Sequence, residues 1–233
     1  MYEKEVVALF GRLGVIIPNS HVIYSSGKHG SIYINKDALY PHAMDTAMLC
    51  RLLTRYFVSF DIDCVVGPEK GGIILAQWAG YYLSEYLWRE VTSVFAEKRR
   101  IPIKQIPLMR PTDVSPLFYE DSFVFTRGYD RFVAGKRVLV VEDVLTTGTT
   151  VRKVVELVRA CGGRVEGVGA LWNRGSVTSR DIGDVPRLFS LLDINIDAWE
   201  SNECPLCRRN IPINTELGKG QELGIERGKG ENG

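Results

Sequence analysis

The pattern of hydrophobic and polar positions changes along the chain. Apolar residues recur at helical spacing over residues 2–13 and 45–57, which predicts two amphipathic helices. Between them, residues 21–35 contain two short alternating stretches around a Gly-rich turn, a pattern typical of a β hairpin. From residue 64 onward, short apolar runs lead into Gly-rich or Thr-rich turns and then into helical patterns, which predicts repeated strand–helix units.

The strand–helix pattern is clearest at two places. The apolar run 64–66 leads through a Gly-rich turn into a helical pattern over 73–88, and the run 137–141 leads through a Thr-rich turn into another over 151–160. Further strands are expected at 91–95 and 165–172. Strands that alternate with helices of this length form mainly parallel sheets, whose ligands bind at the carboxyl ends of the strands. We therefore expect an α/β fold with its functional site at that edge.

Two stretches lie outside this pattern. Residues 98–126 lack a sustained period and contain prolines at positions 102, 107, 111 and 116, which predicts a long mobile loop. The end of the chain is rich in glycine and charge, which predicts disorder. The expected organisation is an N-terminal helix and hood segment at 1–40, a core at 41–215 and a disordered tail at 216–233.

The charge balance and the apolar stretches exclude several classes of partner. The chain has 29 basic and 28 acidic residues and a formal charge of +1, so no chain-wide field attracts nucleic acid or an anionic membrane. Charged residues interrupt the apolar residues of the first turns, unlike in a signal peptide, and no apolar stretch reaches the ~20 residues that cross a bilayer. Five cysteines, an odd number, indicate reduced thiols. We expect a cytoplasmic protein that partners neither nucleic acid nor membrane.

The strongest candidate site is the run of residues 138–150, Val-Leu-Val-Val-Glu-Asp-Val-Leu-Thr-Thr-Gly-Thr-Thr. A buried strand delivers two adjacent carboxylates, Glu142 and Asp143, and a turn rich in threonine then begins a helix. Free N–H groups and the dipole at a helix N-terminus favour a phosphate. A simple helix cap also uses threonine, but it requires neither the acidic pair nor four threonines. The run therefore predicts a phosphosugar site.

This run resembles, along its whole length, the phosphoribosyl diphosphate (PRPP) motif of the type I phosphoribosyltransferases. The resemblance implies their fold, a parallel sheet flanked by helices with a small hood over the base site. It implies that Glu142 and Asp143 hold the ribose hydroxyls and that Thr146, Thr147, Gly148, Thr149 and Thr150 cradle the 5′-phosphate. It also implies Mg²⁺ carried by PRPP, without a direct protein ligand.

Other stretches resemble one branch of this family, the orotate phosphoribosyltransferases. Residues 26–33 are similar to the Ser-Gly motif that covers the base, 67–72 to the pyrophosphate loop, 95–98 to the start of the mobile catalytic loop, and 173–174 to the pair that reaches orotate. Residues 125–128 and 204–207 are similar to segments of one bacterial subgroup. The implied product is orotidine 5′-monophosphate, made by a homodimer that shares its active sites.

The resemblance assigns a role to each matching residue. The implied PRPP-binding residues outside the run are Glu69, Lys70, Gly71, Gly72, Lys98, Arg99 and Arg127. The implied base-binding residues are Tyr33, Ile34, Thr147 and Arg174, and the implied catalytic residues are Lys98 and Asp143.

Two departures leave the base open. Ser25 stands where many orotate enzymes have a basic residue, and Glu97 stands where arginine is frequent. The alternatives are a phosphoribosyltransferase for a purine or another base, and a non-catalytic PRPP-sensing regulator on the same fold.

Cys204 and Cys207 have the spacing of metal ligands. A zinc site needs two further ligands, and the chain has no second cysteine pair. Local packing or a redox-sensitive pair is the expected role, and metal binding stays open. His29, next to Lys28, could contact a ligand, but a lone histidine is more often an ordinary loop residue.

Overall fold

The computed structural model describes residues 3–24, 26–102 and 119–220. The chain divides into two compact units, which are described separately below. The hood unit contains the described residues of Met1–Leu49, Trp172–Ser176 and Leu191–Gly233, and the sheet unit contains those of Cys50–Leu171 and Val177–Ser190.

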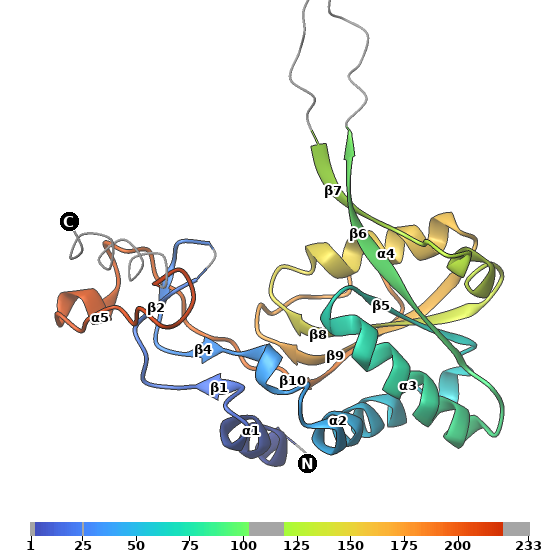
Figure 1. Ribbon diagram of the computed structural model, residues 1–233, viewed down its shortest axis with the longest axis horizontal. Helices are drawn as coiled ribbons and strands as arrows, with labels where there is room; N and C mark the ends of the chain where they lie inside the picture. Colours follow the sequence, from blue (N-terminus) through green and yellow to red (C-terminus); the bar gives the residue numbers. More distant parts are fainter. Residues whose placement is uncertain (1–2, 25, 103–118, 221–233) are drawn as a thin grey trace, which may run out of the picture. The chain divides into compact units, whose positions relative to one another are not determined.

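The sheet unit is built on a six-stranded sheet with the order β10-β9-β8-β5-β6-β7 (Figure 1). The strands of this sheet are β5 (Cys64–Pro68), β6 (Thr92–Pro102), β7 (Tyr119–Val124), β8 (Arg137–Leu145), β9 (Arg164–Asn173) and β10 (Leu188–Leu192). The last two residues of β9 and of β10 are assigned to the hood unit. The central strand β5 runs parallel to both β6 and β8, and β7 runs antiparallel to β6. Every residue of β5 is buried, as expected for a strand covered on both faces. The mainly parallel sheet predicted from the sequence is confirmed.

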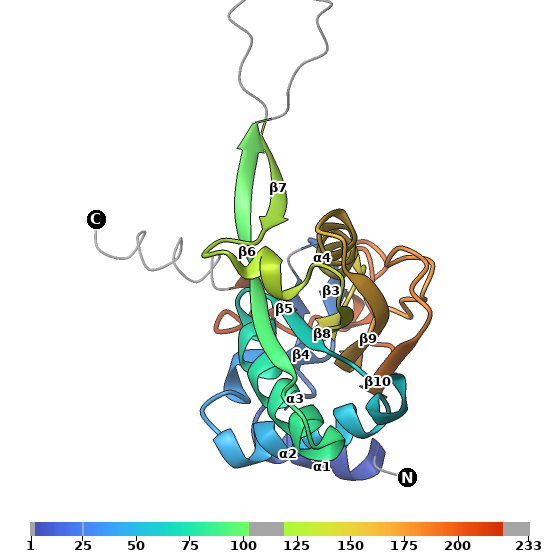
Figure 2. The ribbon, with the colours of Figure 1, turned by 90° about the vertical axis from the view of Figure 1, so that its right-hand side faces the viewer.

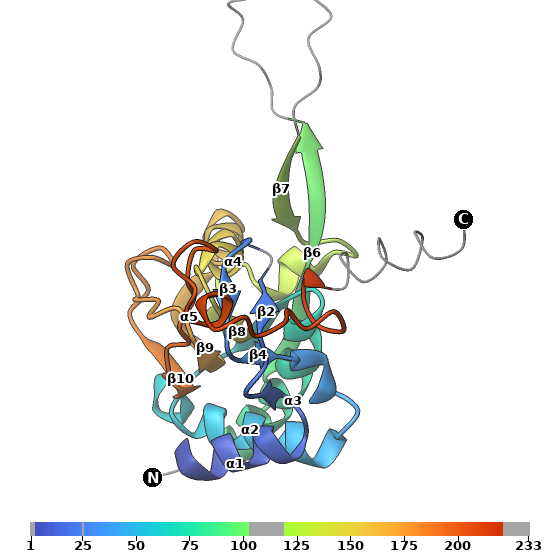
Figure 3. The ribbon, with the colours of Figure 1, turned by 90° about the vertical axis from the view of Figure 1, so that its left-hand side faces the viewer.

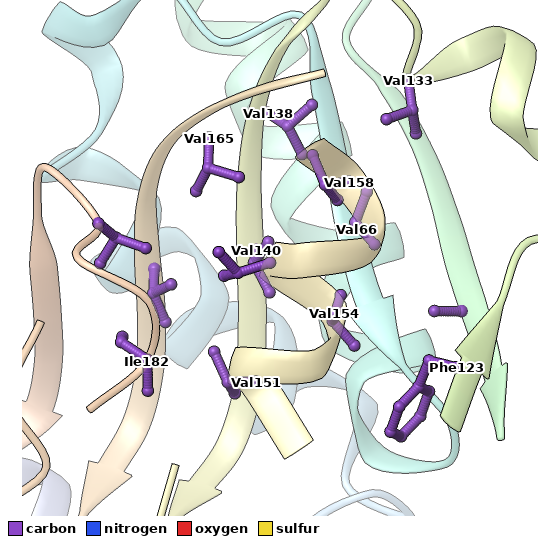
Figure 4. Close-up of a cluster of buried hydrophobic side chains, with 14 of the residues drawn as sticks. Val66, Phe123, Val133, Val138, Val140, Val151, Val154, Val158, Val165 and Ile182 are labelled. Atoms are coloured by element: carbon purple, nitrogen blue, oxygen red, sulfur yellow. The ribbon is translucent and has the colours of Figure 1, made fainter. Parts of the chain in front are cut away.

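Two helices cover the sheet, α3 (Gly71–Leu87) after β5 and α4 (Thr149–Ala160) after β8. Val138 and Val140 of β8 pack in one apolar cluster with α4 (Figure 4). Leu139, between them, is also fully buried and points to the opposite face, because side chains alternate along a strand. The helix α3 packs against β5 and β8 without entering the α4 cluster. Both faces of the sheet are therefore covered.

The predicted loop over residues 98–126 is largely wrong within the described residues. β6 continues to Pro102, and β7 returns from Tyr119 in antiparallel register, with Glu97 opposite Val124. Figure 2 shows this hairpin extending past the end of β5. The sequence hides it because four consecutive charged residues, 97–100, interrupt the alternation, and an exposed two-stranded ribbon needs no continuous apolar face. Residues 103–118 lie outside the described residues.

The hood unit contains short elements (Figure 3). They are α1 (Glu3–Arg12), β1 (Ile16–Ile17), β2 (Val22–Ile23), β3 (His29–Gly30), β4 (Tyr33–Ile34) and α5 (Pro205–Arg208). β1 pairs with β4, and β2 pairs with β3, both antiparallel. The predicted N-terminal helix and hairpin are confirmed. The chain also contains α2 (Ala43–Arg55) and the 3-10 helices η1 (Lys36–Ala38), η2 (Val58–Phe60) and η3 (Tyr129–Phe132).

The C-terminal part of the chain groups with the N-terminal hairpin, unlike the predicted core at 41–215 and tail at 216–233. The Trp199 backbone exchanges hydrogen bonds of 2.8 and 2.9 Å with His29, and the Lys219 N–H donates to the Ile23 carbonyl at 2.9 Å. Gly218 forms an isolated bridge with Ile23. The tail prediction is therefore wrong for residues 216–220, because backbone pairing needs no apolar side chains. Residues 221–233 lie outside the described part. Among the described residues, no helix is long and apolar enough to cross a membrane.

Candidate functional site

Two loops of the sheet unit lie at the same edge of the sheet. Val66 of β5 pairs with Val140 of β8 in parallel register, so continuing the register brings Pro68 opposite Glu142. From β5 the chain passes through α3 to β6, and from β8 it passes through α4 to β9. In the strand order, β6 and β9 flank the central pair β5–β8 on opposite sides, so the two connections run in opposite directions. This reversal is a topological switch point, where open α/β sheets bind their ligands.

The end of β8 presents two buried carboxylates. Glu142 is 7% exposed and Asp143 is 3% exposed. Glu142 Oε1 accepts a hydrogen bond from the Asp143 N–H at 3.0 Å, and Asp143 Oδ1 accepts one from the Val144 N–H at 2.7 Å. These backbone donors fix the orientation of both carboxylates. An ionised carboxylate accepts hydrogen bonds and donates none, so the pair suits a ligand whose hydroxyl groups donate hydrogen bonds.

The turn after β8 is shaped by Gly148. Its φ of +73° lies in the left-handed region, and a Cβ there would come 2.6 Å from Ile182 Cγ2. The hydroxyls of Thr147 and Thr149 lie 2.9 Å apart, and the four threonines of the turn are exposed. The first turn of α4 contains no acidic residue, so its own side chains do not neutralise the N-terminal dipole. The turn suits a bound phosphate.

The loop after β5 is folded tightly on itself. A Cβ on Gly67 would lie 1.9 Å from the Gly72 carbonyl oxygen, so only glycine allows this close backbone contact. The Glu69 N–H donates to the Ala96 carbonyl at 2.9 Å, which ties the loop to β6. The peptide bond between Glu69 and Lys70 is cis. Lys70 is exposed at the start of α3, whose first turn also lacks acidic residues. This loop therefore offers a cation and a helix N-terminus at the same edge as the threonine turn.

The predicted basic residues of the hairpin contact protein carboxylates. Lys98 Nζ lies 2.7 Å from Asp121 Oδ2, and each side chain is about half exposed. Arg99 and Arg127 both contact Glu97, at 3.1 and 3.4 Å. Glu97 therefore organises two of the predicted PRPP-binding cations, whereas Lys98 pairs separately.

A threonine completes the group around Glu97. The Thr126 hydroxyl donates to Glu97 Oε1. Together with Arg127 it holds the pKa of Glu97 below its usual value. Glu97 is therefore ionised near neutral pH and pairs with both Arg99 and Arg127.

The predicted base-binding residues belong to both units. Tyr33 and Ile34 lie half-buried in β4, opposite Ile17 and Ile16. Arg174 also belongs to the hood unit, whereas Thr147 belongs to the sheet unit.

Within the hood unit, Arg174 contacts Tyr24, a residue that sequence reasoning missed. The Arg174 guanidinium lies 5.3 Å from the centroid of the Tyr24 ring, a cation–π distance. The Tyr24 hydroxyl donates to the Ile32 carbonyl at 2.6 Å. Burial raises the pKa of Tyr24, and the charge of Arg174 opposes part of that rise. A Cβ on Gly30 would lie 2.1 Å from the Tyr24 hydroxyl oxygen, so glycine gives the ring its space. The sequence signal that could have identified Tyr24 is an aromatic residue two positions before the Ser-Gly motif.

Comparisons with known proteins agree on one family. The profile of the family "Phosphoribosyl transferase domain" matches residues 46–205. The orotate phosphoribosyltransferase of Caldanaerobacter subterraneus subsp. tengcongensis is 35% identical over 213 residues, which cover 91% of this chain and 96% of that protein. That of Thermotoga maritima is 33% identical over 209 residues, which cover 90% of this chain and 94% of that protein.

The fold has solved counterparts. The crystal structure of orotate phosphoribosyltransferase from Mycobacterium tuberculosis H37Rv is similar with a TM-score of 0.58 at 22% identity, over 82% of this chain and 96% of that one. At this identity the likeness supports the fold, while the curated relatives and the family profile support the assignment. The chain therefore belongs to the phosphoribosyltransferase family, and over nine-tenths of its length it is similar to orotate phosphoribosyltransferases.

Proposed function

We propose that this protein is an orotate phosphoribosyltransferase, which transfers ribose 5-phosphate from PRPP to orotate and releases pyrophosphate. The observation that carries the proposal is the carboxyl edge of β8, where an acidic pair, a threonine turn and a helix N-terminus follow one another at the switch point. The curated relatives, which are named for this activity, support the choice of base.

The sugar phosphate fits the chemistry of the β8 edge. Glu142 and Asp143 would accept hydrogen bonds from the two ribose hydroxyls, and their backbone donors already hold them in place. The backbone N–H groups of the turn and the hydroxyls of Thr147 and Thr149 would bind the 5′-phosphate. Fixing the sugar in this way converts the encounter with the base into a reaction between positioned groups.

The pyrophosphate is the leaving group, and its charge must be neutralised. Mg²⁺ enters as part of the substrate, bound to PRPP, and shares that charge. Lys70 and the N-terminus of α3 would bind the same group from the protein side. We assign Lys98 to it as well, because its ion pair with Asp121 is about half exposed, and such pairs contribute at most about 1 kcal/mol. A polyanion can therefore displace Asp121.

The transfer itself needs no dedicated general base. The bond between C1 of the ribose and the pyrophosphate oxygen breaks through an oxocarbenium-like state, and the ring nitrogen of anionic orotate forms the new bond to C1. Both electrons of the broken bond leave with pyrophosphate. Carboxylates and cations held in place before the reaction stabilise the charges that develop.

Orotate carries a carboxylate that uracil and purines lack, and an arginine fork can bind it through two parallel hydrogen bonds. We assign this role to Arg174, which the Tyr24 ring orients. Tyr33 and Ile34 would contact the base ring. A homodimer with shared active sites and a cytoplasmic location complete the proposal.

The test is pyrophosphate release from Mg²⁺ and PRPP, measured in parallel with orotate, uracil, adenine, hypoxanthine and no base. Release with orotate alone is expected. Release with another base instead would identify a phosphoribosyltransferase with a different acceptor base. Bound PRPP without release for any base would favour a regulator.

A further inference from the structure

Four side chains of the hood unit that could bind a metal converge on one point. His21 lies just before β2, His29 lies in β3, and Cys204 and Cys207 belong to the segment that forms α5. Their ligand atoms all lie within 4.8 Å of one another. The two histidines therefore offer the two further ligand positions that the sequence, with no second cysteine pair, does not reveal. These histidines, His29 and His21, lie 178 and 186 residues before Cys207 in the chain, where no local spacing reveals them.

The distances match a tetrahedral ion. Zinc with Zn–S bonds of about 2.3 Å and Zn–N bonds of about 2.0–2.1 Å places sulfur and nitrogen ligands about 3.5–3.6 Å apart, and two nitrogens about 3.3 Å apart. Cys204 Sγ and Cys207 Sγ each lie 3.6 Å from His21 Nε2, and Cys207 Sγ lies 3.4 Å from His29 Nδ1. The two histidine nitrogens lie 2.9 Å apart. These three sulfur–nitrogen distances are already close to those of a tetrahedral zinc site, and the two histidine nitrogens need to separate by about 0.4 Å.

The hydrogen bonding of His21 sets the form that binds metal. Its Nδ1–H donates to the Ile211 carbonyl at 2.7 Å, which leaves the Nε2 lone pair directed at the cluster in the neutral ring. An outer hydrogen bond of this type fixes the tautomer and orientation of metal-binding histidines. Without an ion, His21 Nε2 can only accept a hydrogen bond from a neighbouring N–H or S–H group, whereas an ion satisfies both histidine nitrogens and both sulfurs together.

The backbone around the cluster is already fixed. His29 is paired with Trp199 by two backbone hydrogen bonds, and the Asn214 N–H donates to the His21 carbonyl at 2.7 Å. His21, His29 and Cys204 are 3%, 5% and 0% exposed. The ligands therefore come from two chain segments that already lie together, and water has little access to three of them, whereas Cys207 is partly exposed.

We propose that His21, His29, Cys204 and Cys207 bind one zinc ion, which joins the N-terminal hairpin to the C-terminal segment. Four protein ligands leave no open position, so the site is structural rather than catalytic. The ion would stabilise the hood unit, because the strands β2 and β3 are two residues long and bury little apolar surface. Small units of this kind are commonly stabilised by a metal.

The test is the metal content of the full-length protein, purified under reducing conditions from zinc-supplemented cells. We expect about one zinc per chain. Titration of the zinc-free protein with Co²⁺ should give the visible absorption of tetrahedral cobalt together with thiolate charge-transfer bands. Removal of zinc by a chelator should lower the unfolding temperature.

The chain supplies matched controls for both ligand types. Cys207→Ser and His21→Gln should weaken metal binding by more than the roughly 10–100-fold that loss of an outer-shell partner costs. Cys161→Ser and His42→Gln replace residues outside the cluster and should keep the metal. These readouts are independent of turnover, so their failure leaves the transferase proposal intact, and the reverse also holds.

Three results would overturn the zinc site. The first is wild-type protein without zinc and with a featureless cobalt titration. The second is a Cys204–Cys207 disulfide in protein kept under reducing conditions. The third is equal metal loss in the cluster variants and their controls. The wild-type titration does not depend on whether any variant folds.

Discussion

The edge of the sheet unit and the hood unit are built in different ways. At the sheet edge, the acidic pair and the threonine turn come from thirteen consecutive residues, 138–150, and one strand and one helix position them. In the hood unit, the groups that meet come from distant parts of the chain, as Tyr24 meets Arg174 and His29 meets Cys207. A site made from one strand–turn–helix unit is visible in the sequence, whereas a site assembled by tertiary pairing is not.

The largest effect should come from the buried acidic pair. Asp143→Asn keeps the size of the side chain but removes the negative charge of the carboxylate that accepts hydrogen bonds from the ribose hydroxyls. We therefore expect kcat/KM to fall by about 10²–10³-fold. The measurement is steady-state kinetics together with a thermal melt. Glu156→Gln, on the exposed side of α4 and outside the site, should leave the rate within twofold of wild type. Equal kinetics for Asp143→Asn and wild type would sink the sugar-site assignment.

The threonine turn should respond next. Gly148→Ala combines a left-handed φ with a Cβ 2.6 Å from Ile182, and we expect a loss of about 2–4 kcal/mol of unfolding free energy. Gly162→Ala is the matched control, because its φ of +79° is similar but nothing lies within 4 Å of the added Cβ. Its cost should be about 1 kcal/mol. Denaturant titrations of both variants measure the difference, and equal costs would show that crowding at Gly148 is unimportant.

Arg174 tests the hood side of the comparison. Arg174→Ala should raise the KM for orotate by about 10–100-fold, because the base carboxylate loses a charged hydrogen-bonding partner. The KM for PRPP should change much less. Arg174→Lys should restore little, since an ammonium group cannot reproduce the planar fork. If both substrates respond equally, Arg174 does not contact the base.

The smallest effect on activity is expected at the opposite edge of the sheet, where a substitution should change stability without changing turnover. Asp63, just before β5, accepts hydrogen bonds from the Arg137 guanidinium at 2.8 and 2.9 Å. These bonds hold the pKa of Asp63 far below its usual value. The stabilisation is therefore present above the unfolded pKa of about 3.9 and is lost as the pH falls below it.

Asp63→Asn should lower the unfolding free energy at neutral pH by about 1–2 kcal/mol and flatten its decline below about pH 4. Orotate turnover at neutral pH should stay unchanged. Denaturant unfolding across pH measures this, and an unaltered acid limb would show that the Arg137 pair does not stabilise the fold.

Much of the sheet unit could be predicted from its sequence. The runs at 64–66 and 137–141 form β5 and β8, because a strand buried on both faces must be continuously apolar. Gly148 could be assigned to the turn because the turn requires a positive φ, which glycine adopts readily. The tight contact between Gly67 and Gly72 was not predictable, because it depends on how the loop folds back.

The hairpin of β6 and β7 and the C-terminal segment show where sequence reasoning ends. Charged residues on an exposed ribbon show no alternation of apolar and polar positions. The stretch around Lys98 and Arg99 therefore looks like a loop in the sequence. Residues 216–220 pair through their backbone with Ile23, which leaves no trace in composition. His21 and His29 have no neighbouring ligand in the sequence, so only the pairing of β2 with β3 and the return of the C-terminal segment brings them to the cysteine pair.

One measurement tests the central claim most directly: the products formed by the wild-type protein from PRPP, Mg²⁺ and orotate, identified and quantified beside those of Asp143→Asn. We predict that the wild type forms orotidine 5′-monophosphate and pyrophosphate in equal amounts and that the variant forms both far more slowly. Absence of the nucleotide with wild type, or its formation at the same rate by both proteins, would contradict a transferase site at the carboxyl edge of β8.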